Sequence, residues 1–140
     1  MSDALIEAAK APAIAYSEKD WGKAKASLAP NCSYDEVATH RKTEGSDQIL
    51  ELWKGWATAF PDSKATFHNA FVSGNVVILE LTWTGTHTGP LVTPDGEVPA
   101  TGKSLEMRAV QIQEIQDGKV ASQRQYFDMA TMMSQLGLTG

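Results

Sequence analysis

The spacing of apolar positions predicts helices in the first half of the chain and strands in the second. Leu5, Ala9 and Ala13 fall on one stripe at helical spacing, which predicts a helix over residues 4–19 that Pro12 either kinks or restarts. The elements expected next are a short helix over 21–28, a strand over 32–37 and a polar loop over 38–45.

The strongest helical pattern covers residues 46–60. Ser46 is a suitable N-cap, Asp47 favours the positive end of the helix dipole, and Pro61 ends the element. One face of this helix is apolar and mostly aromatic, and it consists of Ile49, Leu52, Trp53, Trp56 and Phe60.

From Lys64 onward the apolar period changes to two. Val77, Leu79 and Leu81 alternate with polar residues, which is typical of a strand with one covered face. The segment 88–102 is rich in glycine and proline, so we expect a long loop that could act as a flap over a pocket. The expected strands are 64–72, 76–87, 103–115 and 119–128, and a final helix is expected over 128–136.

Helices that precede a run of hairpin-connected strands indicate an α+β fold. A helix with one apolar stripe has to bury it, and the open face of a curved sheet is the surface available. We therefore predict one domain over residues 1–140, with a cone-shaped, curved antiparallel sheet covered on its concave face by the N-terminal helices.

Charge and cysteine content narrow the classes of partner. The net charge is −5 with only 12 lysines and arginines, and no segment gathers them into a basic stripe, so we expect no nucleic-acid partner. The N-terminus lacks a basic leader region, no apolar run reaches the roughly 20 residues of a membrane span, and Cys32 is the only cysteine. These features predict a cytoplasmic protein without a membrane partner.

Several short motifs occur along the chain at a characteristic spacing and order. They are Asp20-Trp21, Gly45, Ala59-Phe60-Pro61-Asp62, Gly85-Thr86-His87-Thr88-Gly89, Pro99-Ala100-Thr101-Gly102-Lys103, Asp117-Gly118-Lys119-Val120, Tyr126-Phe127-Asp128 and Gln135-Leu136-Gly137. Together, over about residues 14–138, they resemble the SnoaL-like polyketide cyclases and related ester cyclases, within the nuclear transport factor two-like superfamily.

The resemblance implies a cofactor-free intramolecular aldol ring closure in which an aspartate near the end of the last strand removes an acidic proton. Asp128 is the matching position, and its pKa would have to be raised toward neutrality by an apolar site. The alternative is that Asp128 caps the last helix, since it stands directly before Met129-Ala130-Thr131.

The turn at Asp117-Gly118 decides which residues share a face with Asp128. A bulged hairpin would place Glu106, Arg108, Val110 and Ile112 on one face with Arg124, Tyr126 and Asp128, and that face would be the pocket wall. A two-residue turn would place Met107, Ala109 and Gln111 there instead. We favour the first arrangement, because it gathers Gln111, Gln113, Gln123 and Gln125 on the outer face.

Two residues could assist the base electrophilically. Arg108 could orient a carbonyl or stabilise an enolate, although a guanidinium near Asp128 would also lower the pKa of that carboxyl, and a plain ion pair with Glu106 is the alternative. His87 could act as the general acid or be a loop histidine with a backbone partner.

An aromatic lining is expected for the pocket, although an aromatic stripe is also typical of plain core. Relatives often carry tryptophan or histidine at the position of Arg124, so this pocket is expected to be more polar. Tyr34, Asp35 and Glu36 are expected to be solvated. The predicted substrate-binding residues are Trp53, Trp56, Phe60, Trp83, Glu106, Arg124 and Tyr126.

The sequence thus predicts a cofactor-independent cyclase or isomerase that acts on a polyketide-like or other small apolar carbonyl compound. The alternative is a non-catalytic small-ligand-binding protein of the same fold. No histidine or cysteine spacing suggests a metal site, so we expect neither metal nor cofactor. The Gln- and Thr-rich outer sheet surface favours a homodimer through that face.

Overall fold

The helices occur where the apolar spacing predicts them. The computed structural model describes residues 2–93 and 96–138. The first helix, α1 (Ser2–Glu18), runs through Pro12 without a restart. The others are α2 (Trp21–Ala26), α3 (Ser46–Ala59) and α4 (Met129–Gln135).

The start of α3 differs from the prediction by one residue. Gly45 is the N-cap, and its φ of 89° lies in the left-handed region that glycine adopts without strain. Ser46 is the first helical residue and is buried, so the prediction that its side chain caps the helix is wrong.

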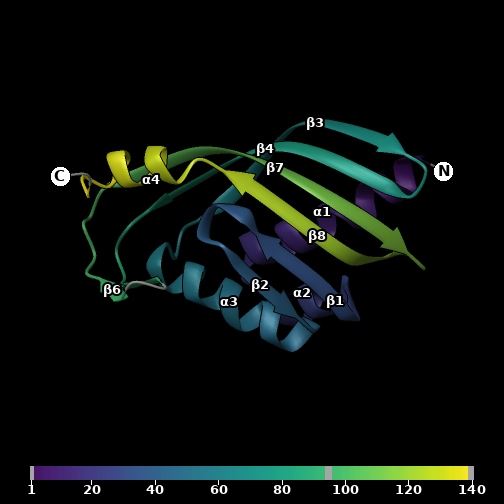
Figure 1. Cartoon of the computed structure of the whole chain (residues 1–140), viewed down its shortest axis with the longest axis horizontal. Coiled ribbons are helices and arrows are strands. Elements are labelled where there is room, and N and C mark those ends of the chain that lie inside the picture. Colours follow the sequence, from purple (N-terminus) through teal and green to yellow (C-terminus); the bar gives the residue numbers. More distant parts are fainter. Residues whose placement is uncertain (1, 94–95, 139–140) are drawn as a thin grey trace.

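Six strands form one curved, mixed sheet that bends around α1 (Figure 1). The order across the sheet is β2-β1-β8-β7-β4-β3. The strands are β1 (Leu28–Glu36), β2 (Arg41–Glu44), β3 (Lys64–Ser73), β4 (Val76–Thr86), β7 (Ser104–Gln116) and β8 (Lys119–Phe127).

The predicted α+β class and the helix-covered curved sheet are confirmed, with two corrections. The sheet is not wholly antiparallel, because β1 pairs with β8 in parallel and so joins the N-terminal part of the chain to the C-terminal hairpin. The segment 38–45 is not only a loop, because β2 forms there as an edge strand on β1. Its residues alternate between half-buried and exposed, so it has no apolar signature.

The β7–β8 hairpin combines features of both expected registers. Asp117 and Gly118 both have positive φ, 52° and 74°, and form a two-residue turn between Gln116 and Lys119. A register shift at Glu114/Ile115 then places Val110 opposite Tyr126 and Ile112 opposite Arg124, which is the pairing that the bulged alternative predicts.

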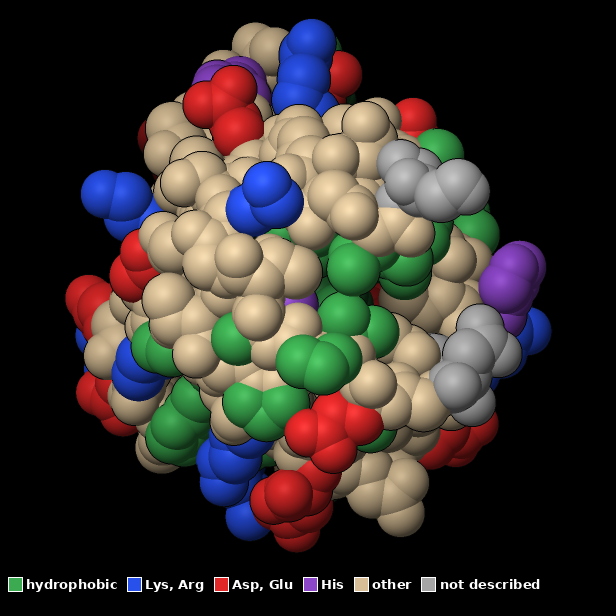
Figure 2. Space-filling view, turned by 90° about the vertical axis from the view of Figure 1, so that its left-hand side faces the viewer, with side chains coloured by type: hydrophobic (Ala, Val, Ile, Leu, Met, Phe, Trp, Pro, Cys, Tyr) green, Lys and Arg blue, Asp and Glu red, His purple; other side chains and the backbone are tan. Residues whose placement is uncertain are grey.

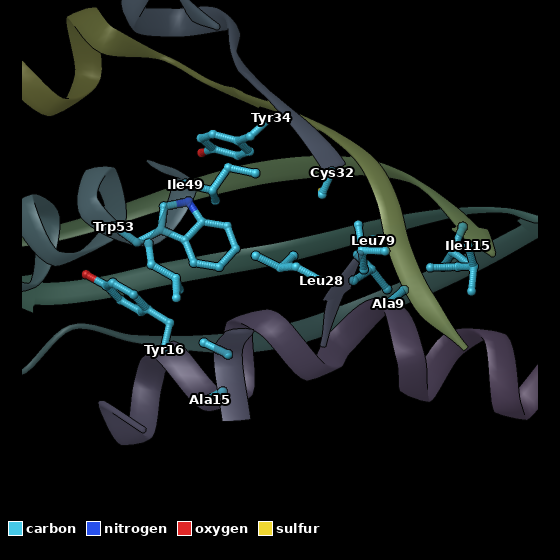
Figure 3. Packing of buried hydrophobic residues seen from close by; sticks show 14 of the residues in the cluster. Ala9, Ala15, Tyr16, Leu28, Cys32, Tyr34, Ile49, Trp53, Leu79 and Ile115 are labelled. Carbon is cyan, nitrogen blue, oxygen red and sulfur yellow. The ribbon is translucent and has the colours of Figure 1, made fainter. Parts of the chain in front are cut away.

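The main core lies between the concave face of the sheet and the helices. Figure 3 shows Ala9 and Tyr16 from α1, Trp53 from α3, and Leu28 and Leu79 from the sheet converging there. Each of these five side chains is at most 7% exposed, so the helices are fixed on the sheet by apolar burial.

A second apolar cluster closes the end of the molecule where α4 lies. The predicted flap, residues 88–102, contains a small hairpin of β5 (Leu91–Thr93) and β6 (Gly96–Val98), although residues 94–95 lie outside the described part. Leu91 is buried in this cluster and Val98 packs on it. The other buried members are Ala59, Phe60, Leu105, Met107, Met132 and Leu136.

Candidate functional site

A cavity opens between the concave face of the sheet and the helices α1 and α3. The cavity and its open mouth together contain about 670 Å³ of space free of protein atoms. The centres of water molecules fit within a smaller volume of about 70 Å³. Figure 2 shows hydrophobic side chains around a hollow near the middle of the end where α4 lies. The lining residues are Pro12, Ala13, Tyr16, Tyr34, Glu36, Trp53, Trp56, Phe60, Ser63, Trp83, Thr84, Leu105, Met107, Gln111, Gln123, Gln125 and Phe127.

Aromatic rings make up much of the cavity wall. Trp56 and Phe60 stack with ring centroids 6.2 Å apart, and Phe127 meets Trp56 edge-on at 6.1 Å. On the other side, Trp83 packs edge-on against Tyr16 at 5.3 Å. Because these rings support one another, the wall has a defined shape in the absence of any ligand.

Glu36, at the end of β1, is the charged residue of the lining. Its side chain is 1% exposed. Oε1 accepts hydrogen bonds from the Thr39 hydroxyl at 2.7 Å and from Arg41 Nη2 at 2.9 Å. Oε2 accepts from the Tyr34 hydroxyl at 3.0 Å and from Trp56 Nε1 at 2.9 Å. The buried carboxylate is therefore paired with the Arg41 cation of β2. It is also hydrogen-bonded by donors from β1, α3 and the short turn that contains Thr39.

Four glutamines on the inner face of β7 and β8 extend this network. Gln125 donates from Nε2 to the Tyr34 hydroxyl at 2.8 Å. Its Oε1 accepts from Trp83 Nε1 and from Gln111 Nε2, both at 2.9 Å. Gln113 Nε2 donates in turn to the amide oxygens of Gln111 and Gln123. The four glutamines and Tyr34 thus form a continuous chain of hydrogen bonds that ends at Glu36.

A hydroxyl pair lies on the helix side of the cavity. The hydroxyls of Tyr16 and Ser63 are 2.7 Å apart. Burial raises the pKa of Tyr16 to about 12, and the negative charge of Glu36 adds to the increase, while the bond to Ser63 opposes it. Tyr16 is therefore a neutral hydrogen-bond donor at physiological pH.

The prediction that Glu106, Arg108, Arg124 and Tyr126 face the pocket is wrong. All four are exposed on the outer face of the sheet, and none lines the cavity. The glutamines occupy the inner face because amides can donate to and accept from one another, whereas like-charged guanidinium groups buried together could not. No ion pair joins Glu106 to Arg108 among the described residues.

Asp128 is exposed and caps α4. Its Oδ1 accepts from the Ala130 amide at 3.0 Å and its Oδ2 from the Thr131 hydroxyl at 2.9 Å. The Thr131 hydroxyl and then the backbone amides lower the pKa of Asp128, which is the opposite of the increase that a poised base requires. The structure thus has the capping arrangement that the sequence left open.

His87 is fully buried behind the cavity wall and is not among the lining residues. Its ring stacks on Phe60 with centroids 5.1 Å apart. The Thr101 amide donates to Nδ1 at 3.2 Å, and Nε2 has no hydrogen-bond partner among the described residues. Burial lowers the pKa of His87, and the Gly89 backbone partly opposes this.

Four of the predicted binding residues, Trp53, Trp56, Phe60 and Trp83, lie on the cavity wall. Sequence reasoning missed the polar residues between them. The prediction that Tyr34 and Glu36 are solvated is wrong, because both are buried and line the cavity, and Asp35 between them is half-buried. The sequence does contain a signal that the glutamines face inward. Gln111 and Gln113 alternate in step with the apolar residues of the same strand, Leu105, Met107, Ala109 and Ile115. The charged residues of β7 share the opposite parity.

Within residues 2–93 and 96–138, no group of three or more His, Cys, Asp or Glu side chains is arranged to hold a metal ion. The helices in the same ranges include none long and apolar enough to cross a membrane.

Solved structures with this fold come from several bacteria. TsrD from Streptomyces laurentii is 22% identical with a TM-score of 0.84, over 99% of this chain and 98% of that one. A Catenulispora acidiphila protein with a ketosteroid isomerase-like fold, in complex with trimethylamine, is 17% identical with a TM-score of 0.80, over 95% and 94%. An epoxide hydrolase of the LEH-like type from M. tuberculosis is 19% identical with a TM-score of 0.74, over 96% and 90%. At these identities the likeness is one of fold.

No match to the sequence is found among curated proteins. A sequence model of the family described as SnoaL-like polyketide cyclase matches residues 6–136. That range includes the whole cavity and every strand of the sheet. The chain therefore belongs to the family of SnoaL-like polyketide cyclases.

Proposed function

We propose that the protein is a cofactor-independent cyclase or isomerase that enolises a small carbonyl compound bound in this cavity. Family membership supports a role of the cyclase or isomerase type. The observation that carries the proposal is an apolar, aromatic-walled cavity with one carboxylate, Glu36, and a neutral hydroxyl donor, Tyr16. Enolisation needs these two groups, a proton acceptor near carbon and a donor near the carbonyl oxygen.

Some hydrogen-bond donors in the cavity have no acceptor among the described residues, which favours a ligand that accepts hydrogen bonds. The Tyr16 and Ser63 hydroxyls have two protons but use only one between them. Gln123 accepts through Oε1, and its amide nitrogen has no partner in the described part of the chain. A carbonyl or enolate oxygen is an acceptor that these donors could bind.

In the proposed reaction Glu36 removes a proton from the carbon next to the carbonyl, and the C–H bonding electrons form the enolate. The enolate oxygen accepts a hydrogen bond from the Tyr16–Ser63 pair. In an isomerisation, the proton returns from Glu36 to a different carbon. In a cyclisation, the enolate carbon attacks a second carbonyl of the same molecule, and the new alkoxide takes the proton. Either route balances without an oxidant or reductant.

One structural condition applies to Glu36. Its carboxylate has about four lone-pair positions, and four donors occupy them. Proton acceptance therefore requires one donor to withdraw. Tyr34 and Trp56 both donate to Oε2 from the cavity wall, and Trp56 is the half-buried one of the two. A ligand that displaces its indole would free one acceptor position on Oε2, while Tyr34 keeps the other.

The resemblance assigns the base to Asp128 instead, and this stays an alternative within the proposal. A base at Asp128 would have to leave its cap on α4 and turn toward the cavity. Its exposure and its lowered pKa favour Glu36.

The test is hydrogen–deuterium exchange at the α-carbon of small cyclic ketones in D₂O, followed by NMR. The wild-type protein is expected to accelerate exchange above the buffer rate, Glu36→Gln to lose at least about 100-fold of that acceleration, and Asp128→Asn to retain it. Loss in Asp128→Asn with retention in Glu36→Gln would move the base to Asp128.

A second candidate function, ligand binding without catalysis, is favoured by the full occupation of the Glu36 carboxylate. It predicts that ketones shift the NMR signals of cavity residues while exchange stays at the buffer rate. The wild type and Glu36→Gln would then show the same rate of hydrogen–deuterium exchange in the ketone.

We also propose a homodimer through the outer face of the sheet. Phe71, Ile78 and Ile112 form one cross-strand row there, and Val110 and Tyr126 lie in the next. Phe71 is 53% exposed and Tyr126 40%. Sedimentation velocity is expected to show a dimer for the wild type and a monomer for Ile112→Glu, whereas a monomeric wild type would refute the proposal.

A further inference from the structure

The loop on both sides of the β5–β6 hairpin is tied together at His87. The His87 amide donates to the Lys103 carbonyl at 2.9 Å, and the Gly102 amide donates to the His87 carbonyl at 2.7 Å. The ring adds a third tie, since its Nδ1 accepts from the Thr101 amide at 3.2 Å. The two backbone bonds continue the β4–β7 pairing one residue beyond Thr86 and Ser104, and the ring bond extends it to Thr101 in the loop.

The hydrogen bonds around the ring determine where its proton lies. The Thr101 amide donates to Nδ1 at 3.2 Å, and the Thr101 hydroxyl, which accepts from the Lys103 amide, lies 3.0 Å from Nδ1. Backbone amides can only donate, so Nδ1 has to be unprotonated and the proton of the neutral ring is on Nε2. Adding a second proton would place an N–H at Nδ1 against the Thr101 N–H.

Protonated His87 would have little compensation, because among the described residues the Gly89 backbone alone favours the charged ring. It is fully buried, and Nε2 has no acceptor among the described residues. α4 and the described residues of β5 have no ionisable side chain. The ionisable groups on the surrounding segments are Asp62, which is bound to Thr86, and the exposed Glu97, Lys103, Glu106 and Asp128. Burial, rather than any of these charges, lowers the pKa of His87.

This connection matters for the cavity because the ring supports its wall. His87 stacks on Phe60, and Phe60 lines the cavity. Leu91 and Val98, which the tied loop carries, pack on the same cluster, which also contains the cavity residues Leu105 and Met107. Releasing the loop would remove apolar cover from this end of the cavity.

We propose that His87 is a pH-sensitive latch, which in its neutral form holds the described parts of the loop, 88–93 and 96–102, against the cavity end and on proton uptake releases them. The use of this latch to admit a ligand rests on the proposed function, whereas the latch itself is testable without any ligand. The proton comes from solvent, and no covalent bond other than N–H changes.

The experiment is amide hydrogen exchange by NMR between pH 7.5 and pH 5, with each rate divided by the intrinsic rate at that pH. In the wild type, the protection of the Thr101 and Gly102 amides is expected to fall at least about tenfold on acidification. In His87→Gln, whose amide oxygen can accept but does not titrate, protection is expected not to change with pH. His68→Gln, at an exposed histidine on β3, is the matched control and is expected to behave like the wild type.

Protection that stays constant in the wild type, or that falls equally in His87→Gln, would overturn the latch. If His87→Gln fails to fold, the ring nitrogen shifts of the wild type decide. The latch requires Nδ1 to be unprotonated at neutral pH and to take up its proton with the same midpoint as the loss of Thr101 protection. A protonated Nδ1 at neutral pH, or midpoints that differ, would refute it. Neither measurement depends on ketone exchange, so the latch and the proposed reaction can fail separately.

Discussion

The two faces of the β7–β8 hairpin carry different kinds of polar residue, and the difference decides where the site lies. On the outer face, Arg108 and Arg124 extend into solvent. On the inner face, Gln111, Gln113 and Gln125 are at most 8% exposed, and Gln111 bonds to both of the others. Gln125 also bonds to Trp83 and Tyr34. A neutral amide can satisfy both its donor and acceptor capacity in a buried ladder, and a cation cannot. Polarity alone therefore does not separate solvent face from cavity face.

The largest effect is expected where the inner ladder is cut. Gln125→Leu removes the acceptor of two buried donors and the donor to Tyr34. We expect it to lower the free energy of unfolding by about 3 kcal/mol, because each orphaned buried group costs about 1–3 kcal/mol. Urea denaturation measures this.

The matched control for that change is Arg124→Leu, one position away on the outer face, and both variants are compared at a protein concentration at which the chain is monomeric, so that the proposed dimer does not contribute. It is expected to stay within about 0.5 kcal/mol of the wild type. Equal effects for the two variants would show that the inner ladder is not more important to stability than the outer face.

The second largest effect is expected at Glu36, the charged residue of the cavity lining. Glu36→Gln leaves the Arg41 guanidinium without its carboxylate. Because Arg41 is 25% exposed and reaches water, we expect a loss of about 2 kcal/mol, below the range for a wholly buried pair. Chemical denaturation checks this, with Glu44→Gln on the exposed side of β2 as control. The double variant Glu36→Gln/Arg41→Gln should recover part of the loss, since no buried charge remains unpaired.

The third effect is a pH dependence of the free energy of unfolding that arises from the buried His87. The pKa of His87 is lower in the folded than in the unfolded state, where it is about 6.5. The unfolded chain therefore takes up the proton first, and the free energy of unfolding should fall as pH drops below about 6.5. Denaturation at pH 7.5 and pH 5.5 should show this fall in the wild type and a smaller one in His87→Gln. An unchanged fall in His87→Gln would assign it to other groups.

The smallest effect is expected at Asp128, on the exposed side. Asp128→Asn weakens the α4 cap but keeps an acceptor, so we expect only a small decrease in Tm at pH 7. The pKa of Asp128 is lower in the folded state, so its stabilisation is present above about pH 4 and is lost as pH falls further. Thermal melts at pH 7 and pH 2.5 should therefore differ between variant and wild type only at pH 7. A large loss at both pH values would indicate a role beyond the cap.

Sequence alone determined the helices, the strands other than β2, β5 and β6, and the α+β class, because these depend on local period and on capping and breaking residues. It also identified the aromatic face of α3, since Trp53, Trp56 and Phe60 share one helical stripe. Period-two alternation in β7 showed that its two faces differ, but the prediction placed the charged face inside, although Met107 and Ala109 have the parity of the inner face.

Only the tertiary structure decided which polar groups are inside. Glu36 is buried because Arg41 arrives from β2 and Trp56 from α3, and neither contact follows from local pattern. The glutamines are buried because β7 and β8 pair in a register that lets their amides bond. The free energy of burying a polar group depends on partners that are distant in sequence, so the chemistry of this cavity is a property of the assembled fold.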